Sequence, residues 1–197
     1  MKSSLFKLSA QVYGRTVFAT VINFFTYFSI IMVATVLSNT EGKMSSVALS
    51  VVNAFALLIE LTVYVIIVFT PLWNRGYKDS NAVTYHHKQE NLFTGVLIGL
   101  IASIPAFLGY LVLVAEKAIG FFSALPAWYR LLNMTFYPLL SWIFGAGATE
   151  GSAALSWSAI ALSACTLLVL PIACGVAYLL GYKGISIHEK LVYKRKK

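Results

Sequence analysis

Charged residues are scarce in this sequence, and none occurs in residues 16–40. Charged side chains make up 11% of the chain, whereas hydrophobic ones make up 59%. Burying one charge in a bilayer costs about 3 kcal/mol, so long uncharged stretches are typical of transmembrane helices. The composition therefore predicts an all-α integral membrane protein, a helical bundle in one membrane domain, and 197 residues leave no room for a second, soluble domain.

Catalytic and metal-binding motifs are missing as well. The chain contains no His-Glu-x-x-His, Gly-x-Ser-x-Gly or phosphate-loop pattern. No predicted span carries the paired carboxylates or the Ser/His sets that intramembrane hydrolases use. Two of the three histidines are adjacent, so on a helix they diverge by about 100° and cannot chelate one ion together. We therefore predict no enzyme activity, no metal and no cofactor.

Four long apolar stretches separate the polar segments. Since one crossing needs about 20 residues, the predicted transmembrane segments are residues 17–37, 47–72, 92–114 and 153–180. We expect Pro71, Trp73 and Asn74 to close the second of them. The flanking segments are residues 1–16, a predicted amphipathic helix on the membrane surface, and residues 183–197, a basic cytoplasmic tail.

Residues 118–149 are apolar and aromatic, but prolines, glycines, Arg130 and Asn133 interrupt them. Neither half is long enough for a comfortable crossing. We predict an interfacial or re-entrant hairpin here, and the alternative is two short crossings that bring the total to six spans. Aromatic rings that suit the headgroup level favour the hairpin: Trp128, Tyr129, Tyr137 and Trp142.

The 15 lysines and arginines are distributed unevenly along the chain. Three lie in residues 1–16, three in residues 75–91 and six in residues 183–197, which leaves Lys43, Lys117 and Arg130. Cations beside membrane spans are retained on the cytoplasmic side. The sequence therefore predicts a multi-pass cell-membrane protein with both termini cytoplasmic. The net charge of +8 reflects this topology, and no basic domain predicts nucleic-acid binding.

The tripeptide Gly-Tyr-Lys occurs twice, at residues 76–78 and 181–183. An internal duplication would give this pattern, but we favour two helices that each end in glycine, with tyrosine and lysine at the inner interface. Together with the Trp-x-x-Gly-Tyr-Lys-Asp sequence of residues 73–79, the motif resembles small multi-pass membrane proteins of bacteria that have no assigned activity. The resemblance implies a bacterial inner-membrane location and transfers no catalytic residue.

An acidic residue, Glu60, lies in the middle of the second predicted span, where an ionised carboxylate without a partner is costly. Polar residues continue from it along one helix face, and a matching stripe on the first span places Tyr27 at about the same depth. The candidate site consists of Asn23, Tyr27, Asn53, Glu60 and Tyr64. It is either a proton or cation site, or a set of interhelical hydrogen bonds worth about 0.6 to 2 kcal/mol each.

Small residues recur in the third predicted span, where they would allow two helix backbones to approach closely. This predicted packing seam is Gly95, Gly99, Ser103, Ala106 and Gly109. Because packing signals are abundant and catalytic motifs are missing, the leading hypothesis is a non-enzymatic accessory or assembly subunit that binds the lipid bilayer and a second membrane subunit. The alternative is a transporter or channel component with a polar intramembrane site around Glu60.

Overall fold

The computed structural model describes residues 2–37, 46–86, 91–121, 124–145, 151 and 154–185. In these residues the fold is helical, without a strand. Three helical segments are long and apolar enough to cross a membrane: Leu5–Leu37, Val47–Thr84 and Trp157–Tyr182. A bent pair, Thr94–Ala102 followed by Ile104–Ile119, passes the same criterion when its two helices are taken together.

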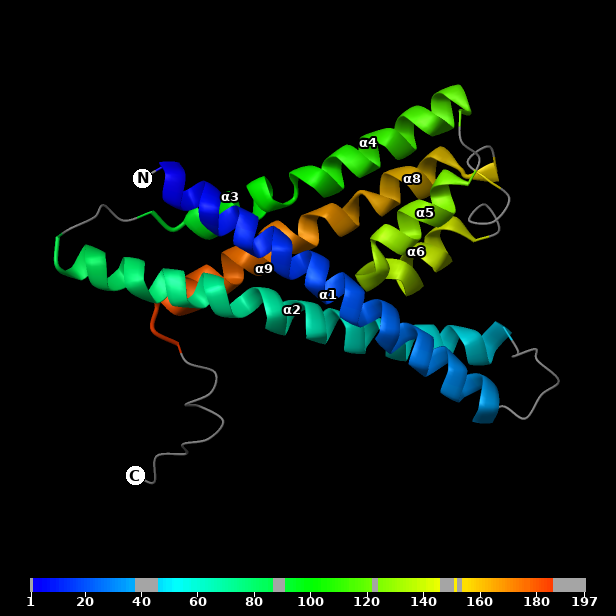
Figure 1. Ribbon diagram of the computed structural model, residues 1–197, viewed down its shortest axis with the longest axis horizontal. Helices are drawn as coiled ribbons and strands as arrows, with labels where there is room; N and C mark the ends of the chain where they lie inside the picture. The colour runs from blue at the N-terminus through cyan, green and yellow to red at the C-terminus, as the bar shows by residue number, and fades with distance from the viewer. Residues whose placement is uncertain are drawn as a thin grey trace.

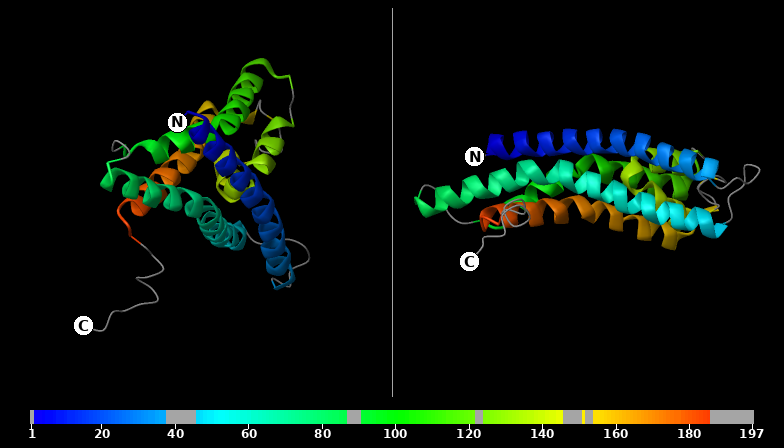
Figure 2. Two further views of the ribbon diagram at one scale, coloured as in Figure 1. Left: turned by 60° about the vertical axis from the view of Figure 1, so that its left-hand side comes forward. Right: turned by 90° about the horizontal axis from the view of Figure 1, so that it is seen from below.

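The long helices lie side by side in an elongated bundle (Figures 1 and 2). The start of α1, the end of α2, the start of α3 and the end of α9 gather at one end, which we call the N-terminal end (Figure 1). The four helices are α1 (Lys2–Leu37), α2 (Ser46–Thr84), α3 (Thr94–Ala102) and α9 (Cys165–Tyr182). Helix α9 packs most extensively on α2 and α3, and α1 packs on α2.

The opposite end, which we call the far end, holds the end of α1 and the start of α2 together with shorter pieces (Figure 1). The shorter pieces are α4 (Ile104–Ile119), α5 (Leu125–Leu132), η1 (Met134–Phe136), α6 (Tyr137–Phe144) and α8 (Trp157–Ser163). Helices α5 and α6 pack together as a hairpin, and the short 3₁₀ helix η1 at its tip reaches α1 and α2. No helix of this hairpin approaches the 20 or so residues of a full crossing. The choice between an interfacial and a re-entrant position stays a prediction.

The outer surface of the bundle is apolar. Phe18, Phe25 and Phe28 of α1 are 59%, 63% and 62% exposed, and only 11% of the apolar window of this helix is buried. Aromatic side chains in such numbers would expose an apolar patch far larger than soluble monomers carry. Acyl chains can cover them at no cost, so the surface agrees with membrane-spanning helices.

Helix α1 runs through residues 16 and 17 without a break. The predicted surface segment and the predicted first span therefore lie on one continuous helix. The last span begins at Trp157 rather than residue 153, because the hydroxyl of Ser156 accepts a hydrogen bond from the backbone N–H of Ala159 at 3.1 Å and caps the helix. It ends at Tyr182, and nearly all of the predicted tail, residues 183–197, lies outside the described residues.

Helix α2 does not end at Leu72, as expected from the sequence, but passes through Pro71 and continues to Thr84. A proline inside a helix has no N–H, so the carbonyl four residues earlier, on Ile67, loses its donor. Arg15 of α1 replaces it, since its Nη1 donates to the Ile67 carbonyl oxygen at 3.1 Å. The helix continues because a neighbouring helix satisfies the carbonyl that the proline leaves free.

The third predicted span is broken into α3 and α4, which bend by 48° at Ser103. Pro105, in the first turn of α4, cannot donate to the carbonyl of Ile101, and this favours a break. At the bend, both the hydroxyl and the backbone N–H of Ser103 donate to the Gly99 carbonyl oxygen, at 2.8 and 2.9 Å. Helix α4 then continues beyond residue 114 to Ile119, where Gly120 with φ of 73° terminates it.

The two Gly-Tyr-Lys motifs meet where α2 crosses α9. A Cβ atom on Gly76 would collide with the backbone of Tyr178 and Tyr182, and one on Gly181 would collide with the Trp73 carbonyl. The sequence predicted that Gly76 ends its helix. This prediction is wrong, because Gly76 lies inside α2. Both glycines are needed because the two backbones touch, which any side chain would prevent.

Candidate functional site

Glu60 is fully buried in α2, with 0% of its surface exposed. Its backbone carbonyl accepts a hydrogen bond from Asn23 Nδ2 of α1 at 3.1 Å. Its carboxyl group is different, since neither Oε1 nor Oε2 has a hydrogen-bond partner among the described residues. The site therefore contains an acidic group that the surrounding helices enclose but do not bind.

Asn23 connects three elements of the bundle. Its amide nitrogen donates to the Glu60 carbonyl of α2 and, at 3.0 Å, to Thr135 Oγ1 of η1. Its side-chain oxygen has no partner among the described residues. Asn23 is fully buried, and Thr135 is 2% exposed. The hairpin tip thus reaches the same buried level as Glu60, in the middle of the candidate span Leu5–Leu37.

Tyr27 lies about one turn away from the depth predicted for it. Its hydroxyl donates to Asn53 Oδ1 at 3.0 Å, whereas Asn23 is the residue level with Glu60. Its ring contacts that of Tyr137 in α6, with centroids 4.9 Å apart. The predicted polar stripes of α1 and α2 are thus in contact, and their register is shifted by one helical turn.

Arg130 of α5 is an unexpected neighbour of this cluster. It is 9% exposed, its guanidinium lies over the Tyr137 ring at 5.0 Å, and its Nη1 donates to Ser141 Oγ at 3.2 Å. A buried arginine that stacks on a ring and bonds a hydroxyl is stabilised by both contacts. The sequence placed Arg130 and Tyr137 at the outer headgroup level and gave no signal for Thr135, because the packing of the hairpin tip depends on long-range contacts.

Tyr64 does not join the cluster. It is 5% exposed and belongs to the apolar core, where its ring packs edge-on against Phe136 with centroids 5.9 Å apart. The threonine hydroxyls of the stripe on α1 do not cross to α2 either. Thr16 and Thr20 donate to carbonyls of their own helix at 2.7 and 2.9 Å, as is typical of hydroxyls in membrane helices. Of the predicted residues, Asn23, Tyr27, Asn53 and Glu60 remain in the site.

The predicted small-residue seam divides at the α3–α4 bend. A Cβ atom on Gly99 would lie 2.6 Å from Pro171 Cα, and one on Gly95 would collide with Tyr178 Cβ, so both glycines pack against α9. On the other side of the bend the small residues line a cavity: Ser103, Ala106 and Gly109. Only the first half of the stripe is a helix-packing seam.

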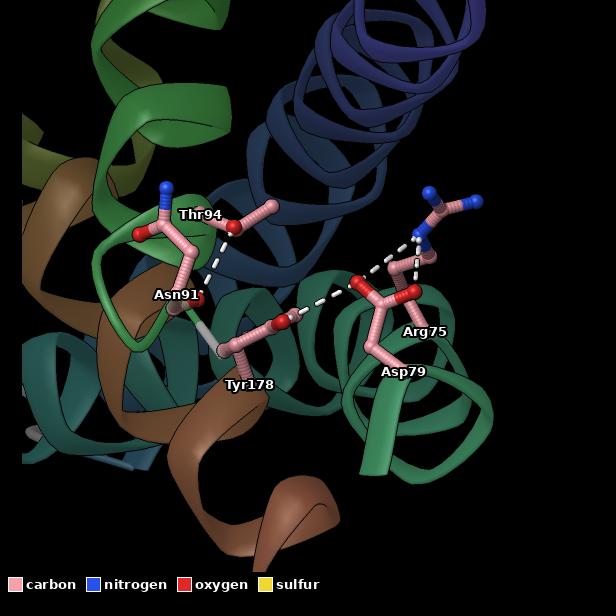
Figure 3. Close-up of polar contacts among 5 residues, drawn as sticks. All are labelled: Arg75, Asp79, Asn91, Thr94 and Tyr178. Atoms are coloured by element: carbon pink, nitrogen blue, oxygen red, sulfur yellow. Dashed lines mark hydrogen bonds and ion pairs between the residues drawn. The ribbon is translucent and has the colours of Figure 1, made fainter. Parts of the chain in front are cut away.

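A second group of polar contacts joins α2 and α9 at the N-terminal end (Figure 3). The Tyr178 hydroxyl donates to Asp79 Oδ2 at 3.0 Å, and Arg75 Nε lies 3.3 Å from Asp79 Oδ1. Thr94 Oγ1 donates to the Asn91 carbonyl oxygen at 3.0 Å where α3 begins. Asp79 is 5% exposed, and its hydrogen bond with Tyr178 joins α2 to α9, whereas the other two contacts are local to α2 and to the start of α3.

No group of three or more His, Cys, Asp or Glu side chains in the described part of the chain could hold a metal ion. No protein-family model, curated protein or solved structure matches the sequence or fold of this chain. The enclosed, unbonded carboxyl group of Glu60 is therefore the chemical feature with the clearest functional content.

Proposed function

We propose that this protein is a component of a membrane transport system in which Glu60 carries a proton inside the bilayer. The observation that supports this role is the burial of a carboxyl group with no hydrogen-bond partner among the described residues. An unpaired carboxylate in such a place costs several kcal/mol, so the group must hold a proton or a cation. Acidic groups of this kind mark proton relays in pumps and transporters.

The hydrogen bonds that hold the helices together do not involve the carboxyl group. Asn23 and Thr135 join α1, α2 and η1, and Tyr27 joins α1 to Asn53. If residue 60 only held the helices together through hydrogen bonds, its backbone carbonyl would be sufficient and an acidic side chain would not be needed. Hard metal cations bind to shells of several oxygens, whereas a proton needs one, so the described neighbours of Glu60 favour a proton.

Glu116 of α4 is also fully buried, and its carboxyl oxygens have no partner among the described residues. It lies one turn before the end of α4 at Ile119, whereas Glu60 lies in the middle of a candidate span. Glu116 is thus a matched control for Glu60, because it is equally buried but does not lie in the middle of a span.

An accessory or assembly role has less support than transport. The predicted small-residue seam packs within the chain at Gly95 and Gly99, where α9 covers it, so this part is not open to a second subunit. We retain a second membrane subunit as a proposed partner on the apolar outer surface. The proposed role transfers protons without making or breaking any other bond, so the protein is not an enzyme.

We propose that α1, α2, the α3–α4 pair and the α8–α9 pair cross the cell membrane, with the hairpin entering from outside and both termini cytoplasmic. The distribution of cations supports this orientation. In a cysteine-free background, cysteines placed at residues 84 and 194 should resist an impermeant maleimide on intact cells, and one at residue 42 should react. Labelling at residue 84 from outside would refute the topology.

Proton flux through proteoliposomes tests the role of Glu60. With a pH dye inside and a negative-inside potassium diffusion potential, the wild-type protein should acidify the lumen at least fivefold faster than protein-free liposomes do. Glu60→Gln removes the titratable group but keeps its size, so this variant should fall to the background rate. Glu116→Gln should keep the wild-type rate. Wild-type flux at background, or full flux in folded Glu60→Gln, would exclude the proposal.

A further inference from the structure

A cavity of about 660 Å³ lies beside the Glu60 cluster, between α1, the α3–α4 bend, the hairpin and α9. This volume is in the range of sites that bind one small molecule. Its wall along α1 spans residues 13–25, which is about 18 Å at 1.5 Å per residue. Phe25 and Leu132 line it and are 63% and 74% exposed, so it opens on the apolar outer surface. Molecules dissolved in the bilayer would have direct access.

Among the described residues, the lining combines apolar side chains with uncharged hydroxyl and amide groups and includes no charged side chain. One of these polar groups is the hydroxyl of Tyr129. Tyr129 is 3% exposed, and its hydroxyl has no hydrogen-bond partner among the described residues. The hydroxyls of Ser163 and Thr166 are near it and donate to backbone carbonyls at 2.7 and 2.8 Å, and neither hydroxyl oxygen is in hydrogen-bonding geometry with the Tyr129 O–H. The Tyr129 O–H is therefore a donor available to a ligand acceptor.

Small residues on α4 keep this cavity open. A Cβ atom on Gly109 would meet nothing within 4 Å. A stripe of small residues that faces empty space does not serve helix packing. It makes room for another molecule instead, and Ser103 and Ala106 on the same wall add to that room.

We infer that this cavity binds an uncharged, single-chain lipid whose head group accepts a hydrogen bond from Tyr129. The length and the apolar walls suit one acyl or prenyl chain. Because none of the described residues that line the cavity is a cation, the lining does not compensate the charge of a phosphate or carboxylate head. The required chemistry, a neutral head with a carbonyl oxygen on one apolar chain, is shared by monoacylglycerols and prenylated quinones.

Photolabelling of the full chain in phosphatidylcholine nanodiscs tests the inference, with a diazirine-bearing monoacylglycerol as probe. Adducts should map to residues 13–25 and to the start of α4. Excess monooleoylglycerol or a short prenylated quinone should displace the probe, and whichever competes at lower concentration identifies the source. Oleate, which carries a charge, should not compete. Adducts spread over the outer faces of α1 and α2, or equal competition by oleate, would overturn the inference.

Two variants test the geometry. Gly109→Phe adds a ring to the cavity wall at a position where a Cβ atom meets nothing within 4 Å, and it should reduce labelling at least tenfold, whereas Gly14→Phe, also with open space around its Cβ, should not. Tyr129→Phe removes one hydrogen bond and should weaken binding about fivefold. Wild-type labelling in either Gly109→Phe or Tyr129→Phe would refute the site. Glu60→Gln should label normally, so failure of the proton proposal would leave this result unaffected.

Discussion

Replacing Gly99 by alanine is expected to destabilise the folded protein by about 2 to 3 kcal/mol, although alanine is the better helix former. The added methyl group would lie 2.6 Å from Pro171 Cα and 2.9 Å from Cys174 Cβ. The first of these atoms belongs to the backbone of α9 and cannot rotate away. Helices α3 and α9 would have to separate, which would disturb one of the largest helix contacts in the bundle.

Gly109→Ala is the matched control for this substitution, since it adds the same methyl group to α4 in open space. Here the helix propensity of alanine should dominate and stabilise the protein by about 0.5 to 1 kcal/mol. Thermal unfolding in mild detergent should therefore shift down for Gly99→Ala and slightly up for Gly109→Ala. Equal melting of Gly99→Ala and the wild type would mean that α3 does not contact α9 closely.

Replacing Glu60 by methionine is expected to stabilise the protein by about 1 to 3 kcal/mol and to abolish proton flux. Methionine fills a similar volume and removes two buried oxygens that have no partner among the described residues. The hydrogen bond from Asn23 survives, because its acceptor is the backbone carbonyl of residue 60. If the carboxyl group instead held the helices together by hydrogen bonds, the same substitution would destabilise the bundle.

Asn23→Leu provides the opposite case. It removes hydrogen bonds to the residue 60 carbonyl and to Thr135, so it should destabilise by about 2 kcal/mol. Melting temperature and proteoliposome flux, measured on the same preparations, separate the two effects. A lower melting temperature for Glu60→Met than for the wild type would identify Glu60 as a structural residue. Higher stability with lost flux is typical of a functional site that is maintained at a cost to stability.

The long apolar helices could be predicted from the sequence because their signal is local composition. Their ends could not, as Pro71 illustrates. A proline followed by tryptophan and asparagine predicts the end of a helix, and the donor that keeps α2 intact is Arg15, which lies on another helix 52 positions before its acceptor Ile67. The bend at Ser103 has a local cause in Pro105. Prolines inside a span can bend a helix or leave it continuous, and the sequence does not show which of the two occurs here.

The candidate site was predictable where it depended on helical periodicity. Asn23, Tyr27, Asn53 and Glu60 were expected on facing stripes of two antiparallel helices, and the structure brings them together with a shift of one turn. Periodicity also selected Tyr64, which packs in the apolar core instead. Residues on one helix face can contact different neighbouring elements along its length. A polar stripe in the sequence therefore does not show which of its residues contact the partner helix.

The hairpin residues of the site could not be found in this way. Thr135 and Arg130 lie in a segment without a clear period, and their positions depend on how the hairpin tip packs between distant helices. The division of the small-residue stripe at the α3–α4 bend has the same origin. Whether a small residue touches a backbone or lines a cavity depends on what faces it, and the stripe itself does not encode that.

The crossing of α2 and α9 makes the two ends of the bundle unequal in compliance. At Gly76 and Gly181 the spacing between helix axes is set by contact between backbones, which have no rotamers to adjust. At the far end, the spacing is set by layers of larger side chains such as Leu113, Leu140 and Phe144, which can repack. If the helices are forced apart, we therefore expect them to separate at the far end and to stay in contact where α2 crosses α9 at Gly76 and Gly181.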